Sequence, residues 1–141
     1  MQTLEQVRAA GLPCFPCRQD KAPLVNKGQS WREAAQLPLD QLRPTAIGGL
    51  PIPNGVVVLD LDLYKGITRQ DAEQALGCTI PWDAALIQTT QSGGEHHAFR
   101  VNWPVKQGDS IGITGLDTRV EGRGYISFGQ GYSPANMFGV L

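Results

Sequence analysis

Two aspartates, Asp60 and Asp62, lie two positions apart in an aliphatic run and are the residues of this chain best suited to chemistry. The run reads Val-Val-Val-Leu-Asp-Leu-Asp-Leu over residues 56–63, which predicts a buried strand whose alternate side chains share one face. Two anions in a poorly solvated place repel each other, and a shared cation relieves that repulsion. Carboxylate oxygens suit hard divalent ions, so the pair indicates a Mg²⁺ or Mn²⁺ site. The alternative is a strand that runs out into a turn, with Asp62 capping the loop.

A third carboxylate follows in the segment Gly-Leu-Asp-Thr-Arg-Val over residues 115–120. On a strand, Asp117 and Arg119 face one way and the residues between them face the other. A site for two cations needs a third carboxylate besides those of Asp60 and Asp62, and Asp117 could supply it. Such a site positions an attacking hydroxyl and a leaving pyrophosphate, and Arg119 would neutralise triphosphate charge. The alternative is a solvated face that carries one acid and one base.

A glycine turn with histidines is the third signal, Ser-Gly-Gly-Glu-His-His over residues 92–97. Glycine has no Cβ, so the backbone amides of such a turn could approach an anion closely. On the strand that follows, His97 falls on the apolar side, which leaves His96 as the better candidate to contact a phosphate, together with Ser92. The alternative is a plain hairpin turn that carries a surface histidine.

The elements that must position these residues are short and separated by glycine and proline, of which the chain has 17 and 10. Thr68 is expected to cap a helix over 68–76, with Asp71 three residues later. Other helical stretches are expected over 2–10, ending at Gly11, and over 31–36, with a turn over 40–43. Further strands are predicted over 12–17, 85–90, 95–101, 116–120 and 125–128, with a brief strand or loop over 46–49. Early helices followed by strand pairs predict an α+β fold.

The composition and charge argue against a membrane-spanning protein, a secreted protein and a strong binder of nucleic acid. The 141 residues suffice for one domain, taken as 1–141, and 41% hydrophobic with 18% charged residues is typical of a globular chain. No apolar run reaches membrane-spanning length, and no secretory signal precedes the first element. The net charge of −1 argues against strong binding of nucleic acid by bulk electrostatics, so we expect weak DNA binding.

The three cysteines, Cys14, Cys17 and Cys78, form an odd set without a signal peptide, which favours a reducing cytoplasm. Cys14 and Cys17 have the C-x-x-C spacing of half a zinc site. No second cysteine pair follows, and the two histidines lie far along the chain. Two buried thiols are therefore the favoured interpretation, with structural zinc as the alternative.

Taken in order, these motifs resemble the N-terminal bifunctional primase–polymerase domain of plasmid, phage and prophage replication proteins, within the archaeo-eukaryotic primase superfamily. The resemblance covers roughly residues 11–128 and rests on several motifs in sequence. These are Leu-Pro-Cys-Phe-Pro-Cys-Arg over 12–18, Lys-Ala-Pro over 21–23, Trp31, Ile-Gly over 47–48, the Asp60-x-Asp62 strand, Ser-Gly-Gly-Glu-His over 92–96, Gly-Leu-Asp-Thr-Arg over 115–119 and Gly-Tyr-Ile over 124–126.

The resemblance implies an RRM-like antiparallel catalytic sheet with flanking helices, and an N-terminal α/β unit packed against it. By the family pattern Asp60, Asp62 and Asp117 would bind the metals, and His96, helped by Ser92 and Arg119, would hold the nucleotide phosphates. The implied reaction is template-directed attack of a 3′-hydroxyl on an α-phosphate, with release of pyrophosphate. The implied partners are an NTP or dNTP, a single-stranded DNA template with its primer, and a helicase after this domain in a larger replication protein.

The chain departs from the family pattern after residue 126, where Ser-Phe-Gly-Gln-Gly-Tyr replaces the usual Pro/Ser-rich segment that closes the far wall of the pocket. Two other functions fit the same residues. One is a catalytically weak module of the same fold that binds single-stranded or origin DNA, with Trp31, Trp82, Trp103 and Tyr125 as possible stacking surfaces. The other is a metal-dependent nuclease, because three carboxylates and a histidine can also activate water.

Overall fold

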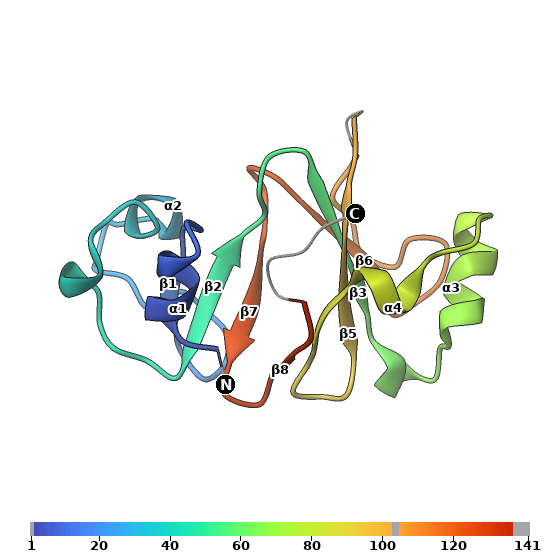
Figure 1. Cartoon of the computed structure of the whole chain (residues 1–141), viewed down its shortest axis with the longest axis horizontal. Helices are drawn as coiled ribbons and strands as arrows, with labels where there is room; N and C mark the ends of the chain where they lie inside the picture. Colours follow the sequence, from blue (N-terminus) through green and yellow to red (C-terminus); the bar gives the residue numbers. More distant parts are fainter. Residues whose placement is uncertain (1, 103–104, 137–141) are drawn as a thin grey trace.

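The computed structural model describes residues 2–102 and 105–136, which form two antiparallel sheets with few and short helices (Figure 1). The fold is therefore α+β, as predicted. One sheet has three strands in the order β1-β2-β7, namely β1 (Phe15–Cys17), β2 (Ile47–Pro51) and β7 (Tyr125–Gly129). The other has five strands in the order β6-β3-β5-β4-β8, namely β6 (Leu116–Val120), β3 (Val56–Leu61), β5 (Glu95–Arg100), β4 (Leu86–Thr89) and β8 (Ser133–Pro134).

The larger sheet has the RRM-like strand order that the resemblance implies. Numbered along the chain, β3, β4, β5 and β6 are the first to fourth strands, and they lie in the order 4-1-3-2. This is the arrangement of a split β-α-β-β-α-β sheet. The helices α3 (Arg69–Leu76) and α4 (Trp82–Ala85) fill the first crossover. The described residues between β5 and β6, 101–102 and 105–115, form no helix.

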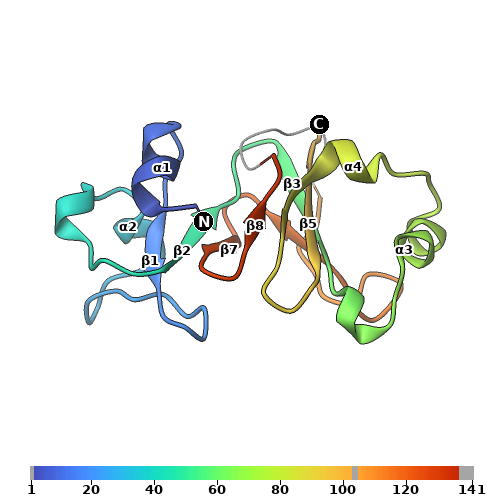
Figure 2. The same cartoon turned by 60° about the horizontal axis from the view of Figure 1, so that its bottom comes forward.

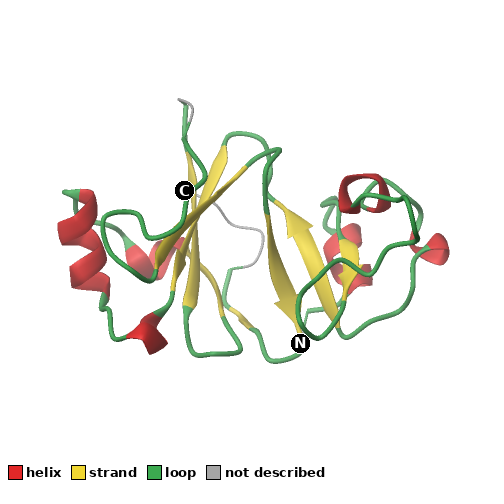
Figure 3. Cartoon of the chain, turned by 180° about the vertical axis from the view of Figure 1, so that it is seen from behind, coloured by secondary structure: helices red, strands yellow, loops and turns green. Residues whose placement is uncertain are grey.

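The helices flank the two sheets, as Figure 2 shows. On one face of the small sheet, α1 (Leu4–Ala9) and a 3-10 turn, η1 (Leu39–Gln41), pack in the core that the two sheets share. On its other face packs α2 (Trp31–Ala34). On the side of the large sheet, α3 and α4 pack beside a second 3-10 turn, η2 (Leu63–Lys65). The inner faces of the sheets lie toward each other, which is visible from behind in Figure 3.

Capping explains why α3 begins where it does. The hydroxyl of Thr68 accepts a hydrogen bond from the Asp71 backbone N–H at 3.0 Å, and the Asp71 carboxylate accepts from the Thr68 N–H at 2.9 Å. These two bonds form the predicted capping box and satisfy two helix donors that lack helical partners. Gly77 ends the helix with a φ of 73°, a left-handed conformation that glycine adopts without strain.

Strand β3 is buried on both faces. Val56 and Val58 point to the core between the two sheets, and Leu59 and Leu61 point to the core under α3 and α4. Asp60 continues the inward row, so the apolar contact between the sheets ends at this carboxylate. Its placement follows from the alternation of the strand.

Several predicted boundaries move by a few residues. The strand expected over 12–17 is β1 alone, and the brief element expected over 46–49 is the five-residue β2 at the centre of its sheet. Cys14 and Cys17 are buried, as the favoured interpretation predicts. Burial raises the pKa of Cys17 to about 12, so this thiol stays protonated. None of the described helices has the length and apolar character needed to cross a membrane.

Candidate active site

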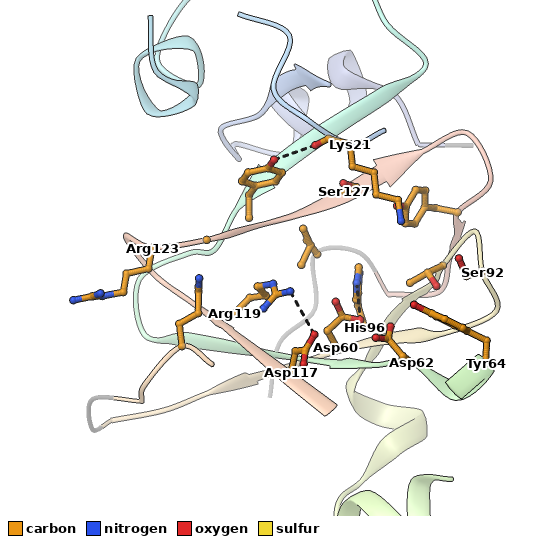
Figure 4. Close-up of a pocket in the computed structure, with 16 residues that line it drawn as sticks. Lys21, Asp60, Asp62, Tyr64, Ser92, His96, Asp117, Arg119, Arg123 and Ser127 are labelled. Carbon is orange, nitrogen blue, oxygen red and sulfur yellow. Dashed lines mark hydrogen bonds and ion pairs between the residues drawn. The ribbon is translucent and has the colours of Figure 1, made fainter. Parts of the chain in front are cut away.

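A pocket of about 440 Å³ opens between the two sheets (Figure 4). This volume lies within the range of pockets that hold small-molecule ligands. Both sheets contribute to the lining, together with the turns that follow β3 and β4. The side chains that line it and could do chemistry are Lys21, Asp60, Asp62, Tyr64, Ser92, His96, Gln107, Asp117, Arg119, Arg123, Ser127 and Tyr132.

Asp60 lies at the centre of a row of three polar residues on neighbouring strands. In the sheet register Asp60 is opposite His96 on β5, and on its other side it is opposite Asp117 on β6. Directly opposed residues of antiparallel strands point to the same face and lie close together. The structure thus brings Asp60, His96 and Asp117 onto one face, and all three line the pocket.

The Asp60 carboxylate is well buried yet stays ionised. Its Oδ1 lies 3.4 Å from Nε2 of His96. Burial alone would raise the pKa of Asp60, but the hydrogen bond from His96 and the charges of Arg119 and Lys21 outweigh it and hold this pKa below its ordinary value. An ionised carboxylate at the floor of the pocket is therefore a stable feature of the fold.

Asp62 lines the same pocket but lies one residue beyond β3, so the prediction that the strand itself carries both carboxylates is wrong in this detail. Its N–H donates to the Gly115 carbonyl at 2.7 Å, which ties the turn to the segment before β6. Its carboxylate lies 3.1 Å from the Lys65 ammonium. Burial raises the pKa of Asp62, and although Lys65 opposes this, the charges of Asp60 and Asp117 add to it. The three carboxylates therefore repel one another across the pocket.

Asp117 and Arg119 share the inner face of β6, as the alternation predicts. The Asp117 carboxylate accepts a hydrogen bond from the Ser110 N–H at 2.8 Å and lies 3.5 Å from an Arg119 guanidinium nitrogen. A second contact joins Arg119 to Asp109 at 3.1 Å. These contacts hold the guanidinium at the edge of the pocket, where it could meet an anionic ligand.

The turn after β4 differs from the predicted anion-binding loop. The Gly93 N–H donates to the Thr90 carbonyl at 3.0 Å, and the Gly94 N–H donates to the Thr90 hydroxyl at 2.9 Å. Both amides are therefore used inside the turn, which is a hairpin turn between β4 and β5. The prediction that these glycine amides cradle a phosphate is wrong for this reason. Ser92 still lines the pocket and could offer its hydroxyl.

His97 faces away from the pocket, as predicted. It is fully buried, its ring packs edge-on against Trp82, and its two nitrogens lie 3.0 Å from the Trp82 carbonyl and from Glu95 Oε1. Glu95 also accepts two hydrogen bonds from Arg69, at 3.0 and 2.8 Å. This network fastens α3 and α4 to the outer face of the large sheet and leaves His96 to the pocket.

The aromatic residues named as stacking surfaces are mostly used for packing. Trp82 is buried, and Trp31 and Tyr125 pack against Phe15 in the core of the small sheet. Trp103 lies outside the described residues. Tyr125 also borders the pocket.

The sequence interpretation missed Lys21, Tyr64 and Arg123 in the pocket lining. Lys21 comes from the loop after β1, far along the chain from the aspartates, so no local sequence pattern could place it beside them. In Figure 4 its hydrocarbon stem and ammonium lie along the pocket. Tyr64, next to the Asp60-x-Asp62 motif, is 57% exposed, and it is the one large apolar side chain that is exposed in the described part of the chain. Its position two residues after the Asp60-x-Asp62 motif was an available signal.

The donor chemistry of the pocket fits a hard divalent cation, because three carboxylates that repel one another line one cavity. In the described arrangement two of them have other partners, Lys65 for Asp62 and Ser110 for Asp117. Over residues 2–102 and 105–136, no group of three or more His, Cys, Asp or Glu side chains is close enough together to hold an ion. Holding one would require these side chains to turn toward Asp60.

A family model described as the N-terminal domain of bifunctional DNA primase/polymerase matches residues 4–133. The chain belongs to this family. The match spans both sheets and every residue of the pocket, and it extends the resemblance inferred from the motifs at both ends. The primase/polymerase family supports a nucleotidyltransferase type of enzyme that binds nucleotide and DNA. No curated protein matches the chain significantly.

Proposed function

We propose that the chain is a metal-dependent, template-directed nucleotidyltransferase, a DNA primase/polymerase that makes primers or extends them on single-stranded DNA in plasmid, phage or prophage replication. One observation carries the proposal: Asp60 is opposed in register by His96 on one side and Asp117 on the other, in a pocket that also holds Arg119 and Lys21. Acidic groups beside cationic groups in one cavity are what a triphosphate with its metal ions requires.

Each side chain has a role that its place supports. Asp60, Asp62 and Asp117 would hold Mg²⁺ or Mn²⁺. His96 Nε2, together with Ser92, would donate to phosphate oxygens, and Arg119 would offset the charge of the triphosphate. The distance between His96 and Asp60 is short enough for a phosphate held by one to contact a cation held by the other.

A bound divalent ion would supply charge stabilisation for the attacking and leaving oxygens. The protein orients the reactants. In the reaction, the 3′-oxygen of the primer bonds to the α-phosphorus, the bond to pyrophosphate breaks, and the hydroxyl proton is released. Lys21 and Arg123 lie at the rim of the pocket on the side of the small sheet, where they could contact template or primer phosphates.

The test is incorporation of labelled nucleotide into a primed single-stranded template by the full chain with Mg²⁺ or Mn²⁺. Asp60→Asn and Asp117→Asn remove one carboxylate charge each with little change in shape, and we expect incorporation to fall at least about 100-fold. Asp40→Asn is the matched control, because Asp40 is exposed in η1, outside the pocket lining. Equal incorporation by Asp60→Asn and the wild type would overturn the proposal.

One observation favours a catalytically weak binding module as the second candidate. Asp62 and Asp117 already have intramolecular partners at 3.1 and 2.8 Å, which a metal would have to replace. The same assay separates the candidates: binding of template without incorporation supports this module, and shortening of the template indicates the nuclease. No feature of the described residues supports a helicase partner, so none is proposed.

A further inference from the structure

Gln88 is a buried polar residue that the proposed reaction does not use. It lies on β4, its side chain is fully buried, and it stands outside the pocket lining, behind His96. Its amide nitrogen Nε2 lies 2.8 Å from His96 Nδ1 and 2.6 Å from the backbone carbonyl of Ser127 on β7. The amide therefore joins the histidine of the large sheet to a strand of the small one.

These two contacts determine where the protons lie. The Ser127 carbonyl can only accept, so the side of the amide that faces it must be the NH₂ group. The same nitrogen faces His96 Nδ1, and because an amide nitrogen only donates, Nδ1 must be the acceptor. A neutral His96 ring held in this way carries its proton on Nε2.

His96 Nε2 is the nitrogen that looks into the pocket, since it lies 3.4 Å from Asp60 Oδ1. We propose that Gln88 is a positioning residue that fixes the His96 ring and its tautomer, so that Nε2–H is presented as a donor to a phosphate oxygen. The consequence for nucleotide binding rests on the proposed function, whereas the tautomer itself does not.

A β-bulge places Gln88 for this task. The register of β4 against β5 shifts between Leu86 and Gln88, so that Leu86 is opposite His97 and Gln88 is opposite His96. Ile87, between them, packs in the core between the sheets, on the same side as the Gln88 contacts. Two consecutive side chains thus point inward, which a regular strand does not allow. The bulge lets an apolar residue fill the core while the next one reaches the histidine.

The amide oxygen of Gln88 also supports this positioning role. Gln88 Oε1 is buried and has no hydrogen-bond partner among the described residues. A side chain needed only for packing would be apolar, because a buried acceptor without a partner is unfavourable. An amide is needed at this position because its two N–H groups donate hydrogen bonds to His96 Nδ1 and to the Ser127 carbonyl.

The first experiment reads the tautomer directly by ¹⁵N NMR of the full chain in alkaline buffer, in which free imidazole is neutral. The chain has two histidines, so assignment needs only His96→Gln. We expect Nδ1 of His96 to be unprotonated and Nε2 to be protonated in the wild type. Gln88→Glu puts an acceptor of equal length against Nδ1, and the proton should move to Nδ1. A wild type protonated on Nδ1, or a folded Gln88→Glu variant with an unchanged tautomer, would overturn the proposal.

The second experiment tests the consequence. Gln88→Met keeps the length of the side chain and removes both hydrogen bonds, and we expect about a tenfold loss of affinity for a labelled triphosphate. Gln36→Met, at an exposed position near α2, is the control and should bind like the wild type. The ¹⁵N signals of His97, on the opposite face, report whether the fold is intact. Wild-type affinity in a folded Gln88→Met variant refutes the positioning role. A wild type that binds no triphosphate refutes the proposed function instead, while the wild-type tautomer still decides the role of Gln88.

Discussion

At the scale of single residues, the site depends on close backbone approach as much as on its charged groups. Gly94 directly precedes β5 and lies beside the end of β3. A Cβ added there would lie 2.7 Å from the Leu61 carbonyl oxygen and 3.5 Å from the Asp62 Cα. Backbone atoms cannot turn away as a flexible side chain can, so any larger residue must displace the turn that carries Asp62.

Gly94→Ala should therefore lower both stability and activity. We expect a loss of about 1–3 kcal/mol in the free energy of unfolding, as for overpacking in a core, and a fall in nucleotide incorporation. Gly93→Ala is the comparison, because its φ of 86° is strained for alanine but nothing lies within 4 Å of the added Cβ. That variant should lose about 1 kcal/mol. Chemical denaturation and incorporation assays measure both, and equal effects of the two variants would contradict the clash.

Much of the site at this scale follows from alternation in the sequence. Asp60, His96, Asp117 and Arg119 take the predicted faces because each lies in a strand, where successive side chains alternate between the two faces of the sheet. Lys21 and Gln88 could not be found in this way. Lys21 comes from a loop, and Gln88 reaches His96 only through a bulge, which no period-two pattern reveals.

At the scale of elements, α3 is held at its start by the capping box and by its first residue, Arg69, which bonds to Glu95. Thr68→Ala removes the hydroxyl that accepts from the Asp71 N–H at 3.0 Å. We expect a loss of about 1 kcal/mol in the free energy of unfolding. Thr79→Ala changes an exposed threonine in the loop after α3 and should have almost no effect. Thermal or urea unfolding of both variants checks the difference, which would vanish if the cap contributed nothing.

The Arg69–Glu95–His97 network should make the fold sensitive to acid. Although burial opposes it, the hydrogen bonds from Arg69 and His97 hold the pKa of Glu95 below its ordinary 4.5 in the folded chain. Burial lowers the pKa of His97 below its ordinary 6.5, against the opposing contact with Glu95. In both cases the unfolded chain binds the proton at a higher pH than the folded chain does. The free energy of unfolding should therefore fall as the pH drops below about 6.5, and further below about 4.5.

Urea unfolding at a series of pH values measures this dependence. Glu95→Gln should be less stable than the wild type at neutral pH, and it should lose the part of the pH dependence that lies below about 4.5, since the Glu95 carboxylate is gone. The part that begins near pH 6.5 should remain, because the Glu95 contact raises the pKa of His97 and its loss lowers that pKa further. If the free energy of unfolding changes equally with pH in the two proteins, protonation of Glu95 does not contribute to the pH dependence of stability. This carboxylate lies on the outer side of the sheet, so the test does not depend on the chemistry of the pocket.

At the scale of elements, the sequence predicts where helices and strands form better than it predicts which strands pair. It indicates α1 to α3 and β1 to β7, because their caps, glycines and apolar periods are local signals. It does not indicate α4, β8 or η2, which are only two to four residues long. It does not show that β6 and β7, which follow each other with one short turn, belong to different sheets. Strand pairing is a long-range choice made by packing. The pocket exists because the chain crosses between the sheets after β2, at this turn, and again between β7 and β8.

At the scale of the whole molecule, the pocket lining combines three cations with three carboxylates, and the chain as a whole carries a formal charge of −1. Lys21, Arg119 and Arg123 are the cations that line it. Affinity for DNA rests largely on phosphates neutralised by such side chains, because each contact releases counterions. A chain with so few cations at its site should bind single-stranded DNA weakly and with a shallow salt dependence.

Fluorescence anisotropy with a labelled single-stranded oligonucleotide at several salt concentrations measures this property of the full chain. If all three cations contact phosphates, the slope of log affinity against log salt should be about −2. Lys21→Ala should reduce the slope by about 0.7, and Lys27→Ala, an exposed residue outside the pocket lining, should leave it unchanged. A much steeper slope, or an equal effect of both variants, would mean that DNA binds across another face of the molecule.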